Sequence, residues 1–242
     1  MAPVTVITGG GRGIGAATAR RLAAAGHHVA LCYLRDHAAA ESVVADLRAT
    51  GVSAVAVCAD TTDPDQVDEL FTAAARLGPL TGLVNNAGVT SLIGPFTELR
   101  VEDLRRVVDV NLIGYVLCAQ QAARRMTDGG AIVNVSSAAA TLGGPGEYVH
   151  YAAAKGATDT LTVGLAKELA PRGIRVNAVA PGIVRTDIHA VSGVPDRPDR
   201  AADRIPLGRA GEPDEVAAAI AWLLGPDASY TTGTVLRVAG GL

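Results

Sequence analysis

The sequence predicts an α/β fold in which one doubly wound parallel sheet of about seven strands carries helices on both faces. Three observations lead to this prediction. Short β-branched runs alternate with longer alanine-rich amphipathic segments along the 242 residues. No linker, charge run or internal repeat divides the chain. The first strand-like run leads directly into a glycine cluster and then a helical segment. We therefore expect a single domain, residues 1–242.

Seven short apolar runs are the predicted strands. They are rich in valine, isoleucine, leucine and alanine, as expected for parallel strands that helices cover on both faces. In chain order they are Val4–Thr8, His28–Cys32, Ala54–Cys58, Leu80–Asn85, Ala131–Val135, Arg175–Val179 and Val235–Val238.

Helices are predicted between these strands. Asp63-Pro64 and Glu212-Pro213 each place an acidic residue before a proline suited to the first helical position, so a helix is expected to begin at each. Residues 186–209 break the alternation, because prolines and glycines are mixed there among charged residues. A stretch this long is either a solvated excursion or a functional loop, and its position suggests a substrate lid.

Composition excludes several classes of function. The net charge of -3 provides no basic field for nucleic acid or an anionic membrane. No apolar run approaches the roughly 18 residues that span a bilayer, and the N-terminus lacks the basic segment of a signal peptide. The three cysteines, Cys32, Cys58 and Cys118, have no C-x-x-C spacing, so we expect neither a disulfide nor a metal site. These features favour a cytoplasmic protein.

The glycine cluster after the first strand predicts a phosphate-binding turn. Strand, glycine turn and helix follow in the order that directs backbone N–H groups and a positive helix end at a pyrophosphate. This is the arrangement of a Rossmann-type dinucleotide site, whose expected members here are Thr8, Gly9, Gly11, Arg12, Gly13, Ile14 and Gly15.

The end of the second predicted strand bears on which dinucleotide binds. NAD sites usually carry a carboxylate there for the ribose hydroxyls, but this position falls near Tyr33. Arg12 and Arg35 offer cationic partners for a 2′-phosphate, which favours NADP(H). In the alternative interpretation both arginines are solvated, Asp36 serves the ribose, and the cofactor is NAD(H).

Tyr151 and Lys155 form the strongest chemical signal. They lie four residues apart in a helical segment, so they share one face. A nearby ammonium group would lower the pKa of the phenol from its ordinary value of about 10 toward the range of an acid–base catalyst. Lys155 is one of only two lysines in the chain, which argues against a chance surface pair.

Taken in order, these motifs resemble the short-chain dehydrogenase/reductase family. The glycine turn resembles its T-G-x-x-x-G-x-G fingerprint, Asn85-Asn86-Ala87-Gly88 its N-N-A-G segment, and Tyr151 with Lys155 its Y-x-x-x-K pair. Pro181-Gly182 and Thr186 fit its P-G-x-x-x-T segment. The likeness covers practically the whole chain and includes 3-oxoacyl-(acyl carrier protein) reductase and glucose 1-dehydrogenase members.

The resemblance implies roles for individual residues. The catalytic set would be Asn111, Ser137, Tyr151 and Lys155, with Ser136 structural and Tyr148 lining the pocket. The cofactor would lie against residues of five segments: Tyr33 and Arg35; Asp60 and Thr61; Asn86, Ala87 and Gly88; Tyr151 and Lys155; and Pro181, Gly182, Val184 and Thr186.

The implied function is hydride transfer between NADP(H) and a carbonyl or alcohol carbon, most closely a 3-oxoacyl-type ketoreductase. The alternatives are an NAD(H)-linked alcohol, sugar or steroid dehydrogenase, and, outside enzymes, a cofactor-sensing regulator or a scaffold subunit. The resemblance also implies a homo-oligomer, a tetramer or dimer, with the predicted helices Thr97–Met126 and Tyr151–Leu169 at its interface.

Overall fold

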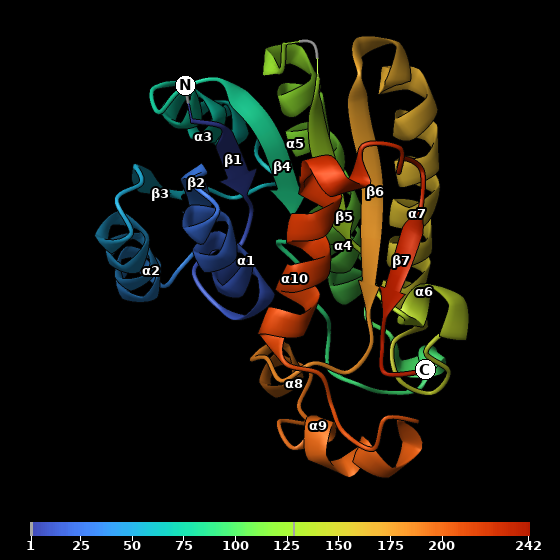
Figure 1. Ribbon diagram of the computed structural model, residues 1–242. Coiled ribbons are helices and arrows are strands. Elements are labelled where there is room, and N and C mark those ends of the chain that lie inside the picture. Colours follow the sequence, from blue (N-terminus) through green and yellow to red (C-terminus); the bar gives the residue numbers. More distant parts are fainter. Residues whose placement is uncertain (1, 128) are drawn as a thin grey trace.

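The computed structural model describes residues 2–127 and 129–242. Within them, seven strands form one parallel sheet in the order β3-β2-β1-β4-β5-β6-β7 (Figure 1). The order reverses between β1 and β4, as in a doubly wound sheet. The predicted fold class, a Rossmann-type α/β sheet with helices on both faces, is confirmed.

The strands agree with the predicted runs to within two residues at each end. Their bounds are β1 Val4–Ile7, β2 His28–Tyr33, β3 Ala54–Cys58, β4 Leu80–Asn85, β5 Gly130–Val135, β6 Ile174–Pro181 and β7 Val235–Val238. The largest difference is at β6, which extends to Pro181 because its last residues pair with β7, up to Pro181 opposite Val238.

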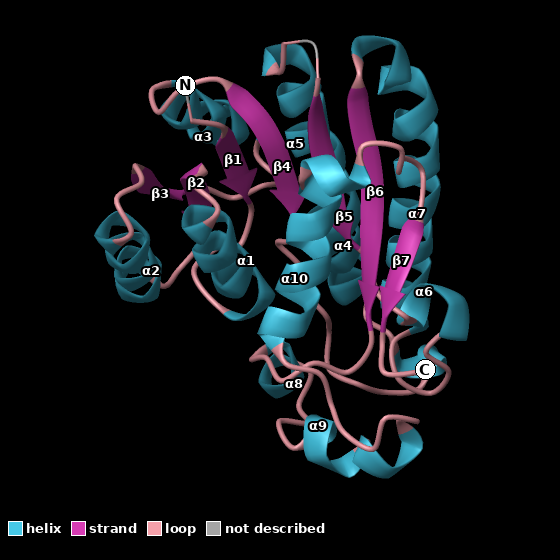
Figure 2. Cartoon of the chain, viewed as in Figure 1, coloured by secondary structure: helices cyan, strands magenta, loops and turns pink. Residues whose placement is uncertain are grey.

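One helical layer covers the front face of the sheet in Figures 1 and 2. It consists of α1 (Gly13–Ala24), α2 (His37–Ala49) and α10 (Pro213–Leu224). The core beneath it contains Leu22, Leu31 and Ile220, all at most 2% exposed. Glu212 caps α10 in a capping box with Glu215, so the helix start predicted there is confirmed.

A second layer covers the opposite face. It contains α3 (Pro64–Ala75), α4 (Val101–Val108), α5 (Gly114–Arg125) and α7 (Val149–Leu169). The core on this side contains Leu70, Phe71 and Ile132, which are fully buried. Asp63 caps α3 by accepting hydrogen bonds from Asp65 N and Gln66 N, as its place before Pro64 predicted.

The predicted helix Thr97–Met126 is wrong as a single element. The structure has a 3₁₀ turn at Phe96–Glu98, then α4, a π-helical turn at Asp109–Ile113, and α5. The interruption has a local cause, because the Asn111 side chain donates hydrogen bonds to Val107 O and Val89 O, both at 2.8 Å. The Asn111 side chain thus provides a hydrogen-bond donor for Val107 O, where the regular backbone hydrogen bonds of the α-helix are interrupted.

Residues 186–209 are not a structureless loop. They contain two one-turn helices, α8 (Ile188–Val191) and α9 (Arg197–Arg200), and a 3₁₀ turn at Ala202–Arg204. In Figure 1 they lie beneath the carboxyl ends of the strands. Ligands of open parallel sheets bind at these strand ends, so the segment covers the edge where a site is expected.

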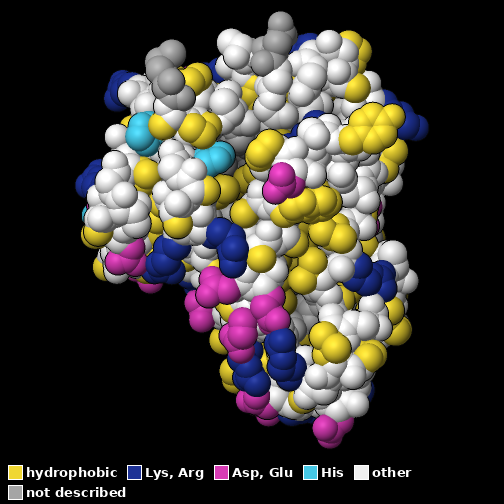
Figure 3. Space-filling model, in the orientation of Figure 1, with side chains coloured by type: hydrophobic (Ala, Val, Ile, Leu, Met, Phe, Trp, Pro, Cys, Tyr) yellow, Lys and Arg dark blue, Asp and Glu magenta, His cyan; other side chains and the backbone are white. Residues whose placement is uncertain are grey.

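The remaining short helices are α6 (Ala139–Leu142) and 3₁₀ turns at Ala170–Arg172 and Pro226–Ala228. None of the helices in the described residues combines the length and apolar character that crossing a membrane requires. On the front face, Figure 3 shows acidic and basic side chains mixed on the lower part of the molecule. Arg185, for example, forms ion pairs with Asp199 at 2.7 Å and with Glu212 at 3.3 Å.

Candidate active site

The glycine turn between β1 and α1 is packed so tightly that side chains cannot be added. Gly9 and Gly13 have φ angles of +63° and +51°, which favour glycine. A Cβ on Gly15 would lie 2.3 Å from Gly9 O and 2.6 Å from Asn86 Nδ2. A Cβ on Gly11 would meet Ala40 of α2 at 3.4 Å. The backbone can therefore approach a ligand closely here, as a pyrophosphate requires.

The segment after β4 locks this turn in place. The Thr8 hydroxyl oxygen accepts hydrogen bonds from Asn86 N and Ala87 N, both at 2.9 Å. In return, Asn86 Nδ2 donates to Thr8 O at 2.9 Å and to Gly9 O at 3.0 Å. The two sequence motifs therefore form one interlocked unit at the point where the strand order reverses.

The first turn of α1 suits an anion. It contains no acidic side chain, and Arg12 at the N-cap makes no side-chain capping bond. The first N–H groups of a helix have no partner within the helix, and the helix dipole adds partial positive charge there. A phosphate group fits this end of α1.

The end of β2 carries the residues that bear on a 2′-phosphate. Arg35 is exposed, and Arg12, 65% exposed, lies 3.7 Å from Asp187. The Tyr33 hydroxyl is 2.7 Å from His37 Nδ1. Asp36 is the N-cap of α2 and accepts a hydrogen bond from Ala39 N at 3.0 Å. A capping function for Asp36 weakens the alternative in which this carboxylate serves the ribose.

Asp60 and Thr61 follow β3. Asp60 Oδ1 accepts hydrogen bonds from Thr62 N at 2.9 Å and from the Thr62 hydroxyl at 2.8 Å. Thr61 is buried against the start of α5, where a Cβ on Gly114 would lie 2.8 Å from its hydroxyl oxygen. The contact of Asp60 and Thr61 with the cofactor stays a prediction.

The start of α7 places Tyr151 and Lys155 in the interior at the carboxyl end of β5. Tyr151 is 9% exposed and Lys155 only 2% exposed. Lys155 Nζ donates hydrogen bonds to Val135 O at 2.8 Å and to the Tyr115 hydroxyl at 3.1 Å. It lies 5.8 Å from the centroid of the Tyr151 ring. The sequence predicted that Tyr151 and Lys155 lie close together, and they do in the structure. Nothing in the sequence indicated Tyr115.

The expected lowering of the Tyr151 pKa is absent from the structure. Burial raises the pKa of Tyr151 to about 12, and a hydrogen bond with Ser137 offsets this only in part. Burial likewise lowers the pKa of Lys155 to about 7, against a smaller opposing effect of Asp159. Desolvation disfavours both charged forms and outweighs the attraction that the i, i+4 spacing suggested.

The two serines after β5 have different environments. Ser136 is 2% exposed, and its hydroxyl points at Lys155 O, 3.4 Å away. Ser137 is half-buried, and its oxygen accepts a hydrogen bond from Ala139 N at 3.1 Å, which leaves its proton free to donate. The position of Ser137 beside Tyr151 fits the predicted role, and that of Ser136 fits a structural one.

Asn111 belongs to the same cluster. Its Oδ1 is buried and has no hydrogen-bond partner among the described residues. A Cβ on Gly88 would lie 3.1 Å from this oxygen and 3.9 Å from Lys155 Nζ. Gly88 is therefore a close neighbour of both Asn111 and Lys155. An unpartnered buried acceptor at this place fits a bound water or hydroxyl group.

The segment after β6 returns to the glycine turn. A Cβ on Gly182 would lie 2.9 Å from Ala239 Cα, so only glycine fits after Pro181. Farther along, a Cβ on Gly13 would lie 3.3 Å from the Thr186 methyl group. Val184 is 5% exposed. Thr186 and the phosphate turn are therefore neighbours, which is compatible with a cofactor extending from one to the other.

Arg197 links residues 186–209 to Tyr148, which is a neighbour of Tyr151. The Tyr148 ring packs edge-on against the Tyr151 ring, with centroids 5.4 Å apart. Arg197 of α9 donates to the Tyr148 hydroxyl at 2.7 Å and to Glu147 at 2.6 Å. The sequence interpretation of Tyr148 as a pocket or packing residue agrees with this arrangement, and Arg197 and Glu147 had no signal in the sequence.

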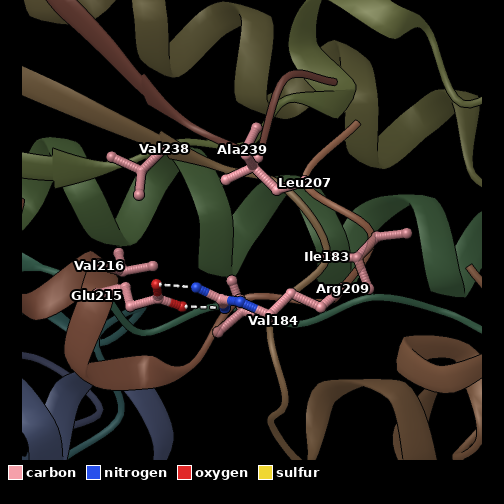
Figure 4. Close-up of a pocket in the computed structure, with 10 residues that line it drawn as sticks. Ile183, Val184, Leu207, Arg209, Glu215, Val216, Val238 and Ala239 are labelled. Carbon is pink, nitrogen blue, oxygen red and sulfur yellow. Dashed lines mark hydrogen bonds and ion pairs between the residues drawn. The ribbon is translucent and has the colours of Figure 1, made fainter. Parts of the chain in front are cut away.

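Two hollows flank these residues without containing the catalytic set. One, of about 110 Å³, lies between the segment after β6 and the start of α10, where Figure 4 shows Arg209 facing Glu215. Ile183, Val184 and Val238 form part of its apolar wall. The other, of about 250 Å³, is lined by residues that include Ser91 and His150. No cluster of three or more histidine, cysteine or acidic side chains in residues 2–127 and 129–242 could hold a metal ion.

Comparisons with known proteins agree with this geometry. The family described as enoyl-(acyl carrier protein) reductase matches residues 9–242. The uncharacterized oxidoreductase YgfF of Escherichia coli (strain K12) is 48% identical and covers 98% of this chain and 99% of its own length. A 3-oxoacyl-(acyl-carrier-protein) reductase of Synechocystis sp. is 40% identical over 100% of this chain and 97% of its own.

A solved structure gives the same result. A short-chain dehydrogenase from Burkholderia cenocepacia J2315, in complex with NADP, has a TM-score of 0.92 and 38% identity, covering 98% of this chain and 96% of that one. The sheet order, the interlocked glycine turn and the Tyr151–Lys155 pair thus coincide with whole-length similarity in sequence and structure. The chain is a member of the short-chain dehydrogenase/reductase family of oxidoreductases.

Proposed function

We propose that this protein is an NADP(H)-dependent ketoreductase of the 3-oxoacyl type, which transfers hydride between the nicotinamide and a carbonyl or secondary alcohol carbon. One observation carries the proposal. The Asn86–Gly88 segment braces the phosphate turn at one end, and at the other a Cβ on Gly88 would lie within 4 Å of both Asn111 Oδ1 and Lys155 Nζ. This proximity supports a single site that joins the cofactor turn to the catalytic residues.

The residues present fit NADP(H). The tight glycine turn and the uncapped start of α1 suit the diphosphate. Arg12 and Arg35 are exposed beside it and offer guanidinium groups for a 2′-phosphate. Asp36 is engaged as the cap of α2. The NADP bound to the Burkholderia cenocepacia protein, a relative in structure and sequence, supports the same choice.

The chain's own residues supply binding and proton transfer. The Ser137 and Tyr151 hydroxyls bind the carbonyl oxygen, which stabilises the negative charge that develops on it. The nicotinamide, when bound, supplies the hydride in reduction and accepts it in oxidation. Because the pKa of Tyr151 is raised to about 12, its phenol holds a proton at neutral pH and donates it to the developing alkoxide.

Lys155 and Asn111 support this step. Lys155 holds the cofactor ribose and Asn111 Oδ1 accepts a hydrogen bond from a water that returns the proton to the site. The buried, unpartnered state of Asn111 Oδ1 supports this role. Residues 186–209 form a substrate lid, and the contacts of Arg197 with Glu147 and Tyr148 hold it against the loop that precedes Tyr151.

The direct test compares wild-type protein with Tyr151→Phe. Turnover is measured through NADPH absorbance on a panel of 3-oxoacyl thioesters, quinones, sugars and steroids, with an enoyl thioester included. We expect 3-oxoacyl thioesters to be the best substrates with NADPH preferred over NADH. Tyr151→Phe should lose about 10²–10⁴-fold in turnover, as loss of a general acid does, while still binding NADPH.

Tyr230→Phe is the matched control, because Tyr230 is fully exposed. It should behave as wild type in every assay. Substantial turnover by Tyr151→Phe would remove Tyr151 from its role. If only the enoyl thioester is reduced, the proposed 3-oxoacyl substrate is wrong. If NADH is preferred over NADPH, the proposed cofactor is wrong.

We further propose a homo-oligomer whose interface lies in the two segments that the sequence indicated, Thr97–Met126, which includes α5, and Tyr151–Leu169 of α7. Ile113, Val116 and Val163 are exposed by 43%, 39% and 37% on or beside these helices. Apolar side chains that are exposed on one subunit lose contact with water when a subunit interface covers them. Light scattering after gel filtration should give a dimer or tetramer, and Val163→Glu should lower the mass. A wild-type monomer would contradict the proposal.

A further inference from the structure

Tyr115 is a buried side chain that belongs to none of the motifs described above. It lies in the first turn of α5 and is 1% exposed. Its hydroxyl donates a hydrogen bond to Val135 O at 3.0 Å and is 3.1 Å from Lys155 Nζ. Since the single hydroxyl proton is committed to Val135 O, the phenol oxygen acts as an acceptor toward Lys155.

These contacts define the orientation of the Lys155 amine. A protonated lysine has three N–H groups. Two of them donate to Val135 O and to Tyr115, at 2.8 and 3.1 Å. The third has no acceptor among the described residues, and Gly88 and the unpartnered Asn111 Oδ1 lie next to this side of the site.

Building on the proposed function, we propose that Tyr115 is a positioning residue that fixes the Lys155 amine against Val135, so that its third N–H faces the space beside Gly88 and Asn111. That space would hold the cofactor ribose and the water of the proton relay. A free lysine side chain has several rotatable bonds, so a second fixed acceptor reduces the number of amine positions. Tyr115 thus acts on the reaction through Lys155.

The charged and titratable groups around the amine are consistent with this role. They are Tyr115 on α5, Tyr151 and Asp159 on α7, and beyond Asp159 the Arg237 side chain of β7. Burial raises the pKa of Tyr115 well above its usual value, so this phenol stays protonated. An acceptor held at the amine stabilises the ammonium form and offsets part of the lowering that burial imposes on the Lys155 pKa.

The composition of the chain offers a direct experiment. Lys155 and Lys167 are its only lysines, so protein grown on ¹³C,¹⁵N-lysine gives two sets of side-chain NMR signals. The exposed Lys167 serves as internal reference. In Tyr115→Phe the Lys155 titration should move to lower pH by about one pH unit, since the ammonium loses one hydrogen bond. NADPH binding, measured by fluorescence, should weaken about tenfold because the amine is no longer fixed.

Thr162→Val is the matched control. It also removes a buried hydroxyl, one that accepts from Asn134 Nδ2 at 2.9 Å, and it lies on α7 away from the amine. We expect it to lower thermal stability without moving the Lys155 titration or NADPH binding. Equal Lys155 titrations in wild type and Tyr115→Phe would overturn the proposal, as would an equal displacement in Thr162→Val, which would indicate general loosening.

A measurement on the wild type keeps the proposal testable if Tyr115→Phe does not fold. The Tyr115 ring carbons, labelled with ¹³C-tyrosine, should titrate together with Lys155, because Nζ lies 4.6 Å from the ring centroid and bonds the hydroxyl. If the Tyr115 ring signals do not change over the pH range in which Lys155 titrates, the contact is refuted. None of these readouts needs a substrate, so their failure is distinct from failure to reduce a carbonyl compound.

Discussion

Arg197 offers the sharpest test of the proposed lid. Its guanidinium group, 11% exposed, is 2.6 Å from a Glu147 oxygen and 2.7 Å from the Tyr148 hydroxyl, and it lies 5.0 Å from the centroid of the Tyr148 ring. Among the described residues, no other side chain of the 186–209 segment forms a hydrogen bond or ion pair with the loop before Tyr151. Arg197→Met keeps most of the apolar length of the side chain and removes all three polar contacts.

The magnitude follows from these contacts. A hydrogen bond to a charged group contributes about 1.5–3 kcal/mol, and Glu147 is 33% exposed, so solvent screening favours the lower end. If the closed lid loses about 1.5–2 kcal/mol of stabilisation relative to the open lid, the ratio of closed to open protein falls roughly 10- to 30-fold. If the carbonyl substrate binds the closed form, its KM should rise by up to this factor, which is reached when the open form predominates, while kcat at saturation changes little.

Two measurements check this expectation. Steady-state kinetics give KM and kcat, and hydrogen–deuterium exchange over residues 192–205 should be faster in Arg197→Met. Arg200→Met is the control, since Arg200 lies on the same helix, is 68% exposed and has only a weak contact, 3.8 Å from Asp196. The reasoning is refuted if Arg197→Met and Arg200→Met have the same KM and the same exchange rates.

Three further predictions concern the cofactor turn and the catalytic phenol. Asp36→Ala should destabilise the protein by about 1 kcal/mol through the lost cap of α2, measured by urea unfolding, and leave the NADPH-to-NADH preference unchanged; a large loss of NADH binding would instead make Asp36 the ribose carboxylate. Gly15→Ala should cost about 1–3 kcal/mol and abolish tight NADPH binding, because its Cβ would lie 2.3 Å from Gly9 O; normal calorimetric NADPH binding would contradict the role of the turn. With the Tyr151 pKa raised to about 12, the phenol stays protonated from pH 7 to 9, so any change in reduction over this range should follow the titration of Lys155, whose pKa is about 7, whereas alcohol oxidation, which needs the phenolate, should keep rising with pH; oxidation that is independent of pH would exclude Tyr151 as its base.

The fold could be predicted because its signals are local and repeated. The β6 run, for instance, is mostly apolar and follows a helical segment, so a strand was predicted from Arg175 onward, within one residue of its start at Ile174. Its end was less clear, because Pro181 belongs to the strand only through pairing with β7, far away in the sequence. The π-helical turn at Asp109–Ile113 escaped for the same reason, since Asn111 reaches Val89 O on another segment.

The candidate site divides in the same way. Gly9, Gly15 and Lys155 belong to motifs of fixed spacing. The two glycines are positioned by β1 and α1, and Lys155 is positioned by α7. The pKa of Tyr151 did not follow, because the i, i+4 spacing gives the direction of a charge effect but not the burial that outweighs it. The burial of Tyr151 depends on residues such as Val107, Ala139 and Tyr148, which pack with it and which the spacing does not contain.

Tyr115 and Arg197 show what kind of residue sequence reasoning misses. Each contacts a residue of the candidate site from a different element: Tyr115 of α5 contacts Lys155, and Arg197 of α9 contacts Tyr148. In a buried site every polar group needs a partner, so a motif such as Y-x-x-x-K implies that acceptors for its lysine exist without saying where in the chain they lie. Because the N–H groups of a buried motif lysine need acceptors, the nearest buried acceptor outside the motif is the next residue to mutate.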